Sequence, residues 1–171
     1  MSGRFASRFL LLHALLSAGI VLAAAQTASA QDALEKMRAD YAAQTNPVDK
    51  AKTLAKLGPR EMAEIRRLSS AGDDDKALAT IEKYRDAVVA TTRALAATGV
   101  DASRHSGGFK ELQISLRMFI RRLDDLILSS QQDVRSPFRA VRSGLETAQN
   151  SLIDALFPVR DAKRPQSATS Q

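Results

Sequence analysis

The residues best suited to chemistry in this sequence lie in one glycine-rich segment, residues 100–108. His105 stands there between Ser103 and Ser106, and histidine can act as an acid, a base or a metal ligand near neutral pH. A serine and a histidine so close in sequence seldom work as nucleophile and base, because a rigid frame must orient both. Only Asp101 lies near as a further ligand, and the chain has no cysteine. We therefore interpret His105 as an exposed loop residue and predict no metal site.

A run of three acidic residues, Asp73-Asp74-Asp75, is the next candidate for a cation site. A calcium loop needs spaced oxygen ligands and a terminal bidentate glutamate, and this run has neither. Acidic side chains at the start of a helix interact favourably with the helix dipole. The run therefore predicts the beginning of a helix.

The surrounding segment, Ala71-Gly72-Asp73-Asp74-Asp75-Lys76-Ala77-Leu78, resembles the turn and second-helix start of a tetratricopeptide repeat. Ala77 and Ile81 stand where such repeats place a small and a larger apolar residue, and the resemblance covers about fifteen residues. It implies binding of a peptide or protein partner in a helical groove. The helix expected before the turn is too long for that family's repeat unit, and no partner repeats follow. The residues themselves favour a plain helical hairpin.

Met37 lies early in the expected mature chain, a position that resembles the haem-ligating methionine of exported four-helix b-type cytochromes. That family takes its second iron ligand from a histidine on the last helix. The last helix expected here, residues 137–157, contains no histidine. We therefore interpret Met37 as a core residue and predict no cofactor.

Arg135, Arg139 and Arg142 recur at i, i+4 and i+7, on one face near the start of the last expected helix. Positive charge near the start of a helix interacts unfavourably with the helix dipole unless a negatively charged group lies close by. Two explanations remain open. The arginines form a patch for an anionic partner, such as a lipid headgroup or a cell-wall polymer, or they pair across a hairpin with nearby aspartates: Asp124, Asp125 or Asp133.

Basic residues exceed acidic ones, 25 against 19, but they do not predict a nucleic-acid partner. Most of the excess lies in the first thirty residues and in the segment after Pro158, so the folded part is close to neutral. The electrostatic footprint that nucleic-acid binding requires is missing. Lys52 and Lys56 form a short basic set on the second expected helix, with Arg60 next beyond Gly58-Pro59.

Apolar residues recur at helical spacing in five segments, which we expect to be helices: about 32–44, 47–70, 74–97, 109–128 and 137–157. Asn46-Pro47 and Ser136-Pro137 are each typical of an N-cap followed by a first-turn proline. Gly58-Pro59 interrupts the second helix, and its apolar phase carries through, which favours a kink over two separate helices. The fourth helix has the cleanest seam: Phe109, Leu112, Leu116, Phe119, Leu123 and Leu126.

Short connections between long amphipathic helices make antiparallel hairpins the natural pairing. We therefore predict an all-α fold, a four- to five-helix antiparallel bundle built from two long helical hairpins. The bundle is expected over residues 31–158, after a cleaved signal peptide at 1–30 and before a disordered tail at 159–171.

The first thirty residues are typical of an export signal. Arg4 and Arg8 precede an apolar run from Phe9 to Ala25, and Ala28-Ser29-Ala30 matches a small-x-small cleavage site. We therefore expect cleavage between Ala30 and Gln31 and a periplasmic or secreted mature protein without disulfides, since the chain has no cysteine.

Three functional classes follow from this sequence. The first is an adaptor that binds another envelope protein. The second is an envelope chaperone or anionic-membrane-surface protein that uses apolar residues off the main seam of the fourth helix, at Ile114, Ile120 and Ile127. The third is an enzyme or metal-dependent factor that uses the loop around His105. The off-seam row also permits a homodimer, because a helix with two apolar faces must bury both.

Overall fold

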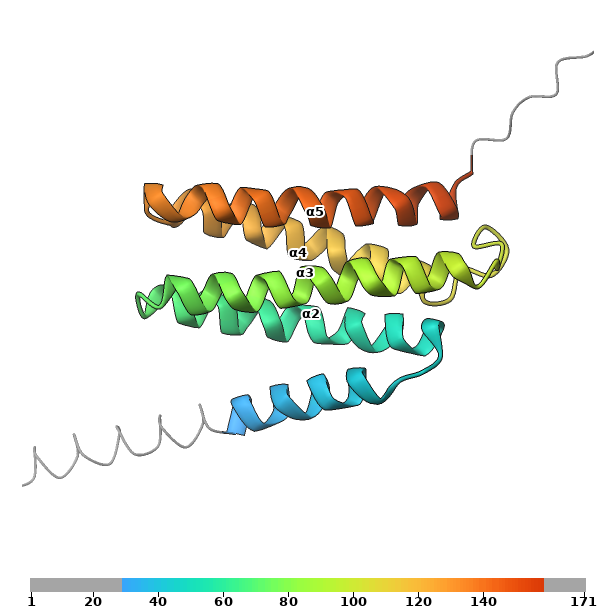
Figure 1. Ribbon diagram of the computed structural model, residues 1–171, viewed down its shortest axis with the longest axis horizontal. Coiled ribbons are helices and arrows are strands. Elements are labelled where there is room, and N and C mark those ends of the chain that lie inside the picture. The colour runs from blue at the N-terminus through green and yellow to red at the C-terminus, as the bar shows by residue number, and fades with distance from the viewer. Residues whose placement is uncertain (1–28, 159–171) are drawn as a thin grey trace, which may run out of the picture. The chain divides into compact units, whose positions relative to one another are not determined.

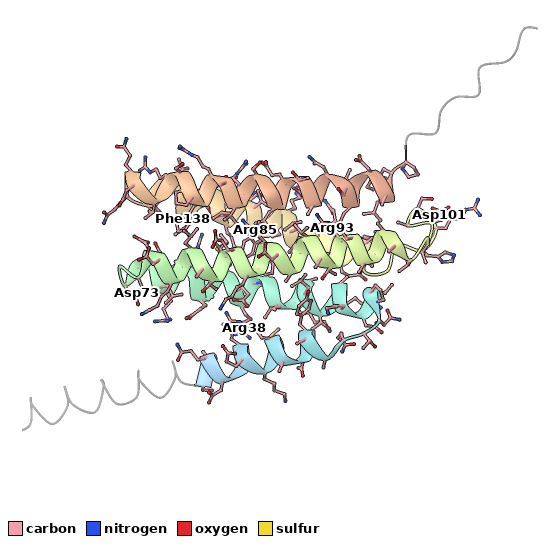
Figure 2. All side chains as sticks on the ribbon, viewed as in Figure 1. Arg38, Asp73, Arg85, Arg93, Asp101 and Phe138 are labelled. Carbon is pink, nitrogen blue, oxygen red and sulfur yellow. The ribbon has the colours of Figure 1, made fainter. Side chains whose placement is uncertain are left out.

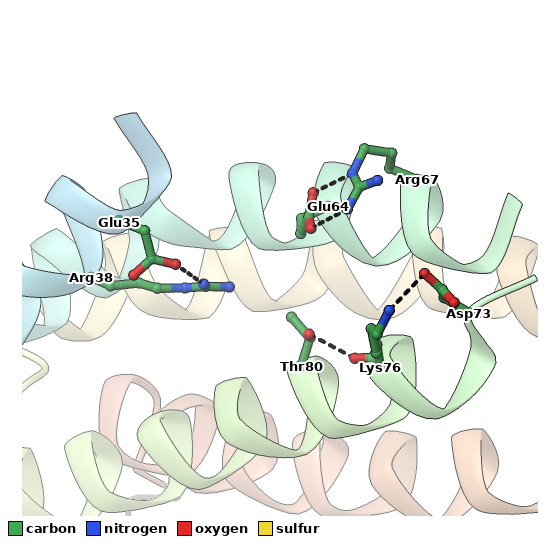
Figure 3. Close-up of polar contacts among 7 residues, drawn as sticks. All are labelled: Glu35, Arg38, Glu64, Arg67, Asp73, Lys76 and Thr80. Atoms are coloured by element: carbon green, nitrogen blue, oxygen red, sulfur yellow. Dashed lines mark hydrogen bonds and ion pairs between the residues drawn. The ribbon is translucent and has the colours of Figure 1, made fainter. Parts of the chain in front are cut away.

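The computed structural model describes residues 29–158 of the chain (Figure 1). The chain divides into two units, residues 1–43 and 44–171, and each is described by itself. In the first unit the described residues 29–43 are helical. Glu35 and Arg38, one turn apart on that helix, form an ion pair of 2.6 Å (Figure 3). Nearly all of the expected signal peptide, and the tail at 159–171, lie outside the described residues.

The second unit is a bundle of the helices α2 (Pro47–Ser70), α3 (Asp74–Ala97), α4 (Phe109–Ser129) and α5 (Gln132–Leu156). This confirms the predicted all-α class and both hairpins, since α2 packs against α3 and α4 packs against α5. The hairpins also pack on each other, because α2 contacts α4 and α3 contacts α5. The four helices therefore form a ring in the order α2, α3, α5, α4.

Neighbouring helices run antiparallel within each hairpin and parallel between the hairpins (Figure 1). The reason is the loop at residues 98–108, which joins α3 to α4 diagonally across one end of the bundle. A hydroxyl of Ser115 on α4 bonds to Ala55 on α2, and farther along both helices Arg66 meets Asp125. These two contacts fix α2 and α4 side by side in the same direction.

The core lies between the four helices of this ring. All six seam residues expected on α4 are buried, and the largest fully buried side chains come from every helix: Phe138, Leu54, Met62, Ile65, Ile81, Leu95, Leu112, Leu116, Leu123, Leu145 and Leu152. Each helix therefore presents one apolar stripe to its neighbours, as packing of amphipathic helices requires.

The start of α2 confirms its predicted cap. The Asn46 side chain accepts hydrogen bonds from the N–H groups of Val48 and Asp49 at 2.9 and 3.2 Å, and Pro47 occupies the first turn. The helix then continues through Pro59 to Ser70, so the alternative of two separate helices is wrong.

The expected start of α5 at Pro137 is wrong, because the helix begins at Gln132 and Pro137 lies inside it. Pro137 is the sixth residue of this helix, so its missing N–H leaves the carbonyl of Asp133, four residues earlier, without its usual helical hydrogen bond. The connection from α4 is correspondingly short. The Arg135 guanidinium donates hydrogen bonds to the carbonyl of Ser130 at 3.0 Å and to the carbonyl of Leu128, in the last turn of α4, at 3.2 Å.

The acidic run and the histidine loop lie at opposite ends of the bundle, as the labels of Asp73 and Asp101 in Figure 2 show. Asp73 pairs with Lys76 at 3.1 Å at the start of α3, next to the Glu64–Arg67 pair on α2 (Figure 3). Within residues 29–158 no helix combines the length and the apolar character needed to cross a membrane.

Candidate functional site

The most distinctive surface feature of the bundle is a half-open groove between α2 and α4, with a volume of about 560 Å³. Its lining is mainly apolar: Ala55, Gly58, Pro59 and Met62 from α2, and Ile114, Met118 and Phe119 from α4. Volume and lining are typical of a ligand-binding or peptide-binding groove. Two large apolar side chains on its α4 wall, Ile114 and Met118, are 51% and 46% exposed.

Pro59 explains why α4 lies so close to α2 at the groove. Proline has no N–H, so the carbonyl of Ala55, four residues earlier, loses its helical hydrogen bond. The Ser115 hydroxyl on α4 donates to that carbonyl at 2.8 Å. The bond satisfies a backbone group that Pro59 leaves open and fixes the register of the two helices.

Gly58 allows a third helix to reach the same point. A Cβ atom at this position would lie 2.6 Å from the Tyr84 hydroxyl, which is closer than real Cβ atoms approach. It would also lie 3.0 Å from the Ser115 Oγ, a tight contact. The Tyr84 ring, from α3, stacks on Phe119 with ring centroids 4.3 Å apart. Gly58 and Phe119 line the groove, so a small residue on α2 and an aromatic ring held by stacking on Tyr84 form its floor.

Contacts between α2 and α4 lie beyond both ends of the groove. At one end Gly108 lies against the Val48 backbone, where a Cβ would be 3.1 Å from two backbone atoms, and its positive φ of 81° also favours glycine. At the other end Arg66 and Asp125 form an ion pair of 3.7 Å between α2 and α4. Between these contacts the groove is lined on α2 from Lys52 to Met62, about ten residues, roughly 15 Å or three turns.

The rim of the groove is basic. Lys52, Lys56 and Arg122 line it, and the single acid is Glu111. Glu111 accepts the Gly108 N–H at 2.8 Å, which caps the start of α4. Lys52 lies 3.6 Å from Asp49, whereas Lys56 and Arg122 are exposed and have no ion pair within the described part of the chain. Two cations therefore border an apolar surface without an internal counter-charge.

The off-seam isoleucines divide between the groove and the core. Ile114 is exposed on the groove wall, but Ile120 and Ile127 are only 6% and 5% exposed, so the expected row of three accessible isoleucines is wrong. The reason is the corner position of α4, which packs against both α2 and α5. A helix with two neighbours buries a wide stripe, and that stripe includes positions beside the main seam.

The arginine cluster on α5 is largely engaged within the protein. Arg142 binds Asp124 across the hairpin and Glu146 at 2.7 Å, and the hydrogen bond that it donates to Asp124 raises the pKa of its guanidinium. Arg135 donates to carbonyls at the end of α4. Arg139 is exposed and has no ion pair in residues 29–158. Of the two explanations left open by the sequence, pairing accounts for Arg142.

The loop around His105 is organised by Asp101, not by the histidine. The Asp101 carboxylate accepts the Ser103 hydroxyl at 2.6 Å and the Ser103 N–H at 3.0 Å, and the hydroxyl bond lowers the pKa of Asp101. The His105 side chain is exposed and bonds to neither neighbouring serine in the described structure. Within residues 29–158 no group of three or more histidine, cysteine or acidic residues is placed to hold a metal ion.

Sequence reasoning noted Lys52, Lys56 and Gly58-Pro59 but did not connect them with α4. The sequence did contain a clue. A proline inside a helix leaves the carbonyl four residues earlier without its hydrogen-bond donor, which predicts a donor on a neighbouring helix. The sequence alone did not show that α2 and α4 are neighbours. No protein-family model, curated protein or solved structure matches this chain, so the function has to be argued from this geometry.

Proposed function

We propose that this chain is an exported binding protein that acts without catalysis and holds a segment of another envelope protein in the α2/α4 groove. The observation that carries the proposal is the groove itself, about 560 Å³ of mainly apolar surface with exposed Ile114 and Met118 on its wall. Exposed apolar surface gathered in one concave place is typical of an interaction site, whereas single exposed apolar residues are ordinary.

The architecture of the groove supports binding over chemistry. The residues that line it include no nucleophile beside a base. Two of its polar side chains already form hydrogen bonds within the protein, since Ser115 bonds to Ala55 and Glu111 bonds to Gly108. Met118 is flexible, polarisable and half exposed, so it can adapt to the side chains of a partner. A firm floor with an adaptable methionine on its wall suits recognition of an apolar segment.

Export is the second part of the proposal. Its support is the order of Arg4 and Arg8, the apolar run to Ala25 and the Ala28-Ser29-Ala30 site. Mass spectrometry of the protein recovered from the producing cell tests this part, and we expect a chain that begins at Gln31. An intact N-terminus in the cytoplasmic fraction would contradict it.

Site-specific crosslinking in the native host tests the binding surface. A photo-reactive side chain in place of Met118, on the groove wall, should give one dominant crosslinked protein. The matched control replaces Leu128, which is also an exposed apolar residue of α4 (74%) but lies outside the groove. Equal crosslinking from both positions would contradict the proposal, and many unrelated products from both would favour an envelope chaperone.

A further inference from the structure

The charge of the cations on the rim indicates what kind of segment the groove binds. We infer that the groove binds an acidic amphipathic helix, whose apolar face lies on the floor and whose carboxylates meet Lys56 and Arg122. This inference rests on the proposed function and adds the chemistry of the partner. It uses the charge complementarity between an unpaired basic rim and an acidic segment.

The placement of the two cations on opposite walls suits an occupant with separated negative charges. The Ser115–Ala55 bond puts residue 115 of α4 level with residue 55 of α2, so Lys56 is level with Leu116. Arg122 lies six positions farther along α4, about 9 Å, and on the opposite wall. A helix can present carboxylates on both flanks of its apolar stripe, one toward each of these cations.

The dimensions of the groove agree with a helix. The three turns of α2 that line the groove, from Lys52 to Met62, match the i, i+3, i+4 and i+7 anchors of a helix that lies in a groove. A partner of this size would also cover the exposed faces of Ile114 and Met118, which a chain lying only on the floor would leave in water.

A second copy of this chain fits the groove less well. In a symmetric dimer each surface meets its own copy, so the basic rim would face a basic rim. Lys52, Lys56 and Arg122 together outweigh the single acid, Glu111, which is already bonded to Gly108. Like charges brought together in this way oppose association.

The test uses designed peptides and the mature protein. The probe is a fluorescent peptide of roughly eighteen residues, long enough to form a helix, with leucine at the anchor positions and glutamate on both flanks. One control peptide carries lysine in place of glutamate, and another has the same composition in scrambled order. We expect fluorescence anisotropy to show saturable binding of the acidic helix, and at least about tenfold weaker binding of both controls.

Variants of the protein locate the site. Ile114→Glu and Met118→Glu together, at exposed positions, should abolish binding without unfolding the bundle, and Leu128→Glu is the matched control that should leave binding unchanged. Lys56→Gln and Arg122→Gln should each weaken binding up to about fivefold at low salt, and less at high salt. Arg121→Gln, an exposed neighbour outside the groove, is the control for Arg122→Gln.

The remaining outcomes separate this inference from the proposed function. Crosslinking from position 118 to one protein, with no effect of Lys56→Gln or Arg122→Gln on that crosslink, would overturn the acidic helix and leave the protein-binding groove. Absence of peptide binding together with binding to phosphatidylglycerol vesicles that requires Lys56 and Arg122 would overturn both in favour of a membrane surface. Dimerisation that Met118→Glu abolishes would overturn the inference in favour of a second copy.

Discussion

The two sides of α4 differ in whether the cations along them are paired with carboxylates. On the α5 side Arg142 is held by Asp124 and Glu146, and Leu145 beside it is fully buried. On the α2 side Lys56 and Arg122 border an open groove and have no ion pair in the described residues. A cation that already has a carboxylate supports the fold, whereas a cation beside open apolar surface is available to a partner. Spacing along one helix cannot distinguish the two cases.

Removal of a core side chain from the closed side should have the largest effect. Leu145→Ala leaves a cavity at a fully buried position and should lower the free energy of unfolding by about 3 kcal/mol. Met118→Ala, on the open side, should lower it by less than about 1 kcal/mol, because the Met118 side chain is half in water already. Urea denaturation followed by circular dichroism measures both, and equal losses would erase the contrast between the two sides.

A methyl group at Gly58 tests the close approach beneath the groove. Gly58→Ala should lower the free energy of unfolding by about 1–2 kcal/mol, since the clash with Tyr84 and Ser115 exceeds the gain in helix propensity. Gly144→Ala is the matched control, because its Cβ would meet only the flexible Arg85 side chain at 3.0 Å. We expect that variant to gain about 0.5–1 kcal/mol. A stabilising Gly58→Ala would show that the floor is looser than the structure has it.

The hydroxyl of Ser115 should matter only while Pro59 is present. Ser115→Ala leaves the Ala55 carbonyl without a donor and should cost about 1 kcal/mol. In a Pro59→Ala background the new N–H can bond to Ala55, so the same change should cost close to nothing. A double-mutant cycle measures the coupling, and independent effects of the two changes would contradict the account of Pro59.

The smallest effect should separate paired from unpaired cations. Arg142→Gln removes the bonds to Asp124 and Glu146 and should lower the free energy of unfolding by about 0.5 kcal/mol, less at high salt because the pair is partly exposed. Arg122→Gln should leave stability unchanged and act only on partner binding. Thermal unfolding at two salt concentrations tests this, and the reverse order would assign Arg122, not Arg142, a structural role.

The sequence was sufficient for most of the fold because helices record their burial in local periodicity. The α4 seam from Phe109 to Leu126, the Asn46 cap and the loop at 100–108 were all predicted and confirmed. The start of α5 was not, because Ser136-Pro137 has the pattern of an N-cap followed by a first-turn proline, whereas the helix begins at Gln132 and continues through Pro137.

Only the tertiary structure decided which helices are neighbours, and with that the candidate site. The diagonal loop puts α2 beside α4, so Ser115 reaches the carbonyl that Pro59 leaves open, and Met118 and Arg122 face Lys56 across a groove. The same packing buries Ile120 and Ile127 and gives Arg142 its partner in Asp124. Periodicity within a helix shows which face is apolar, but exposure and pairing depend on residues that are distant in sequence, and one chain's pattern does not contain their positions.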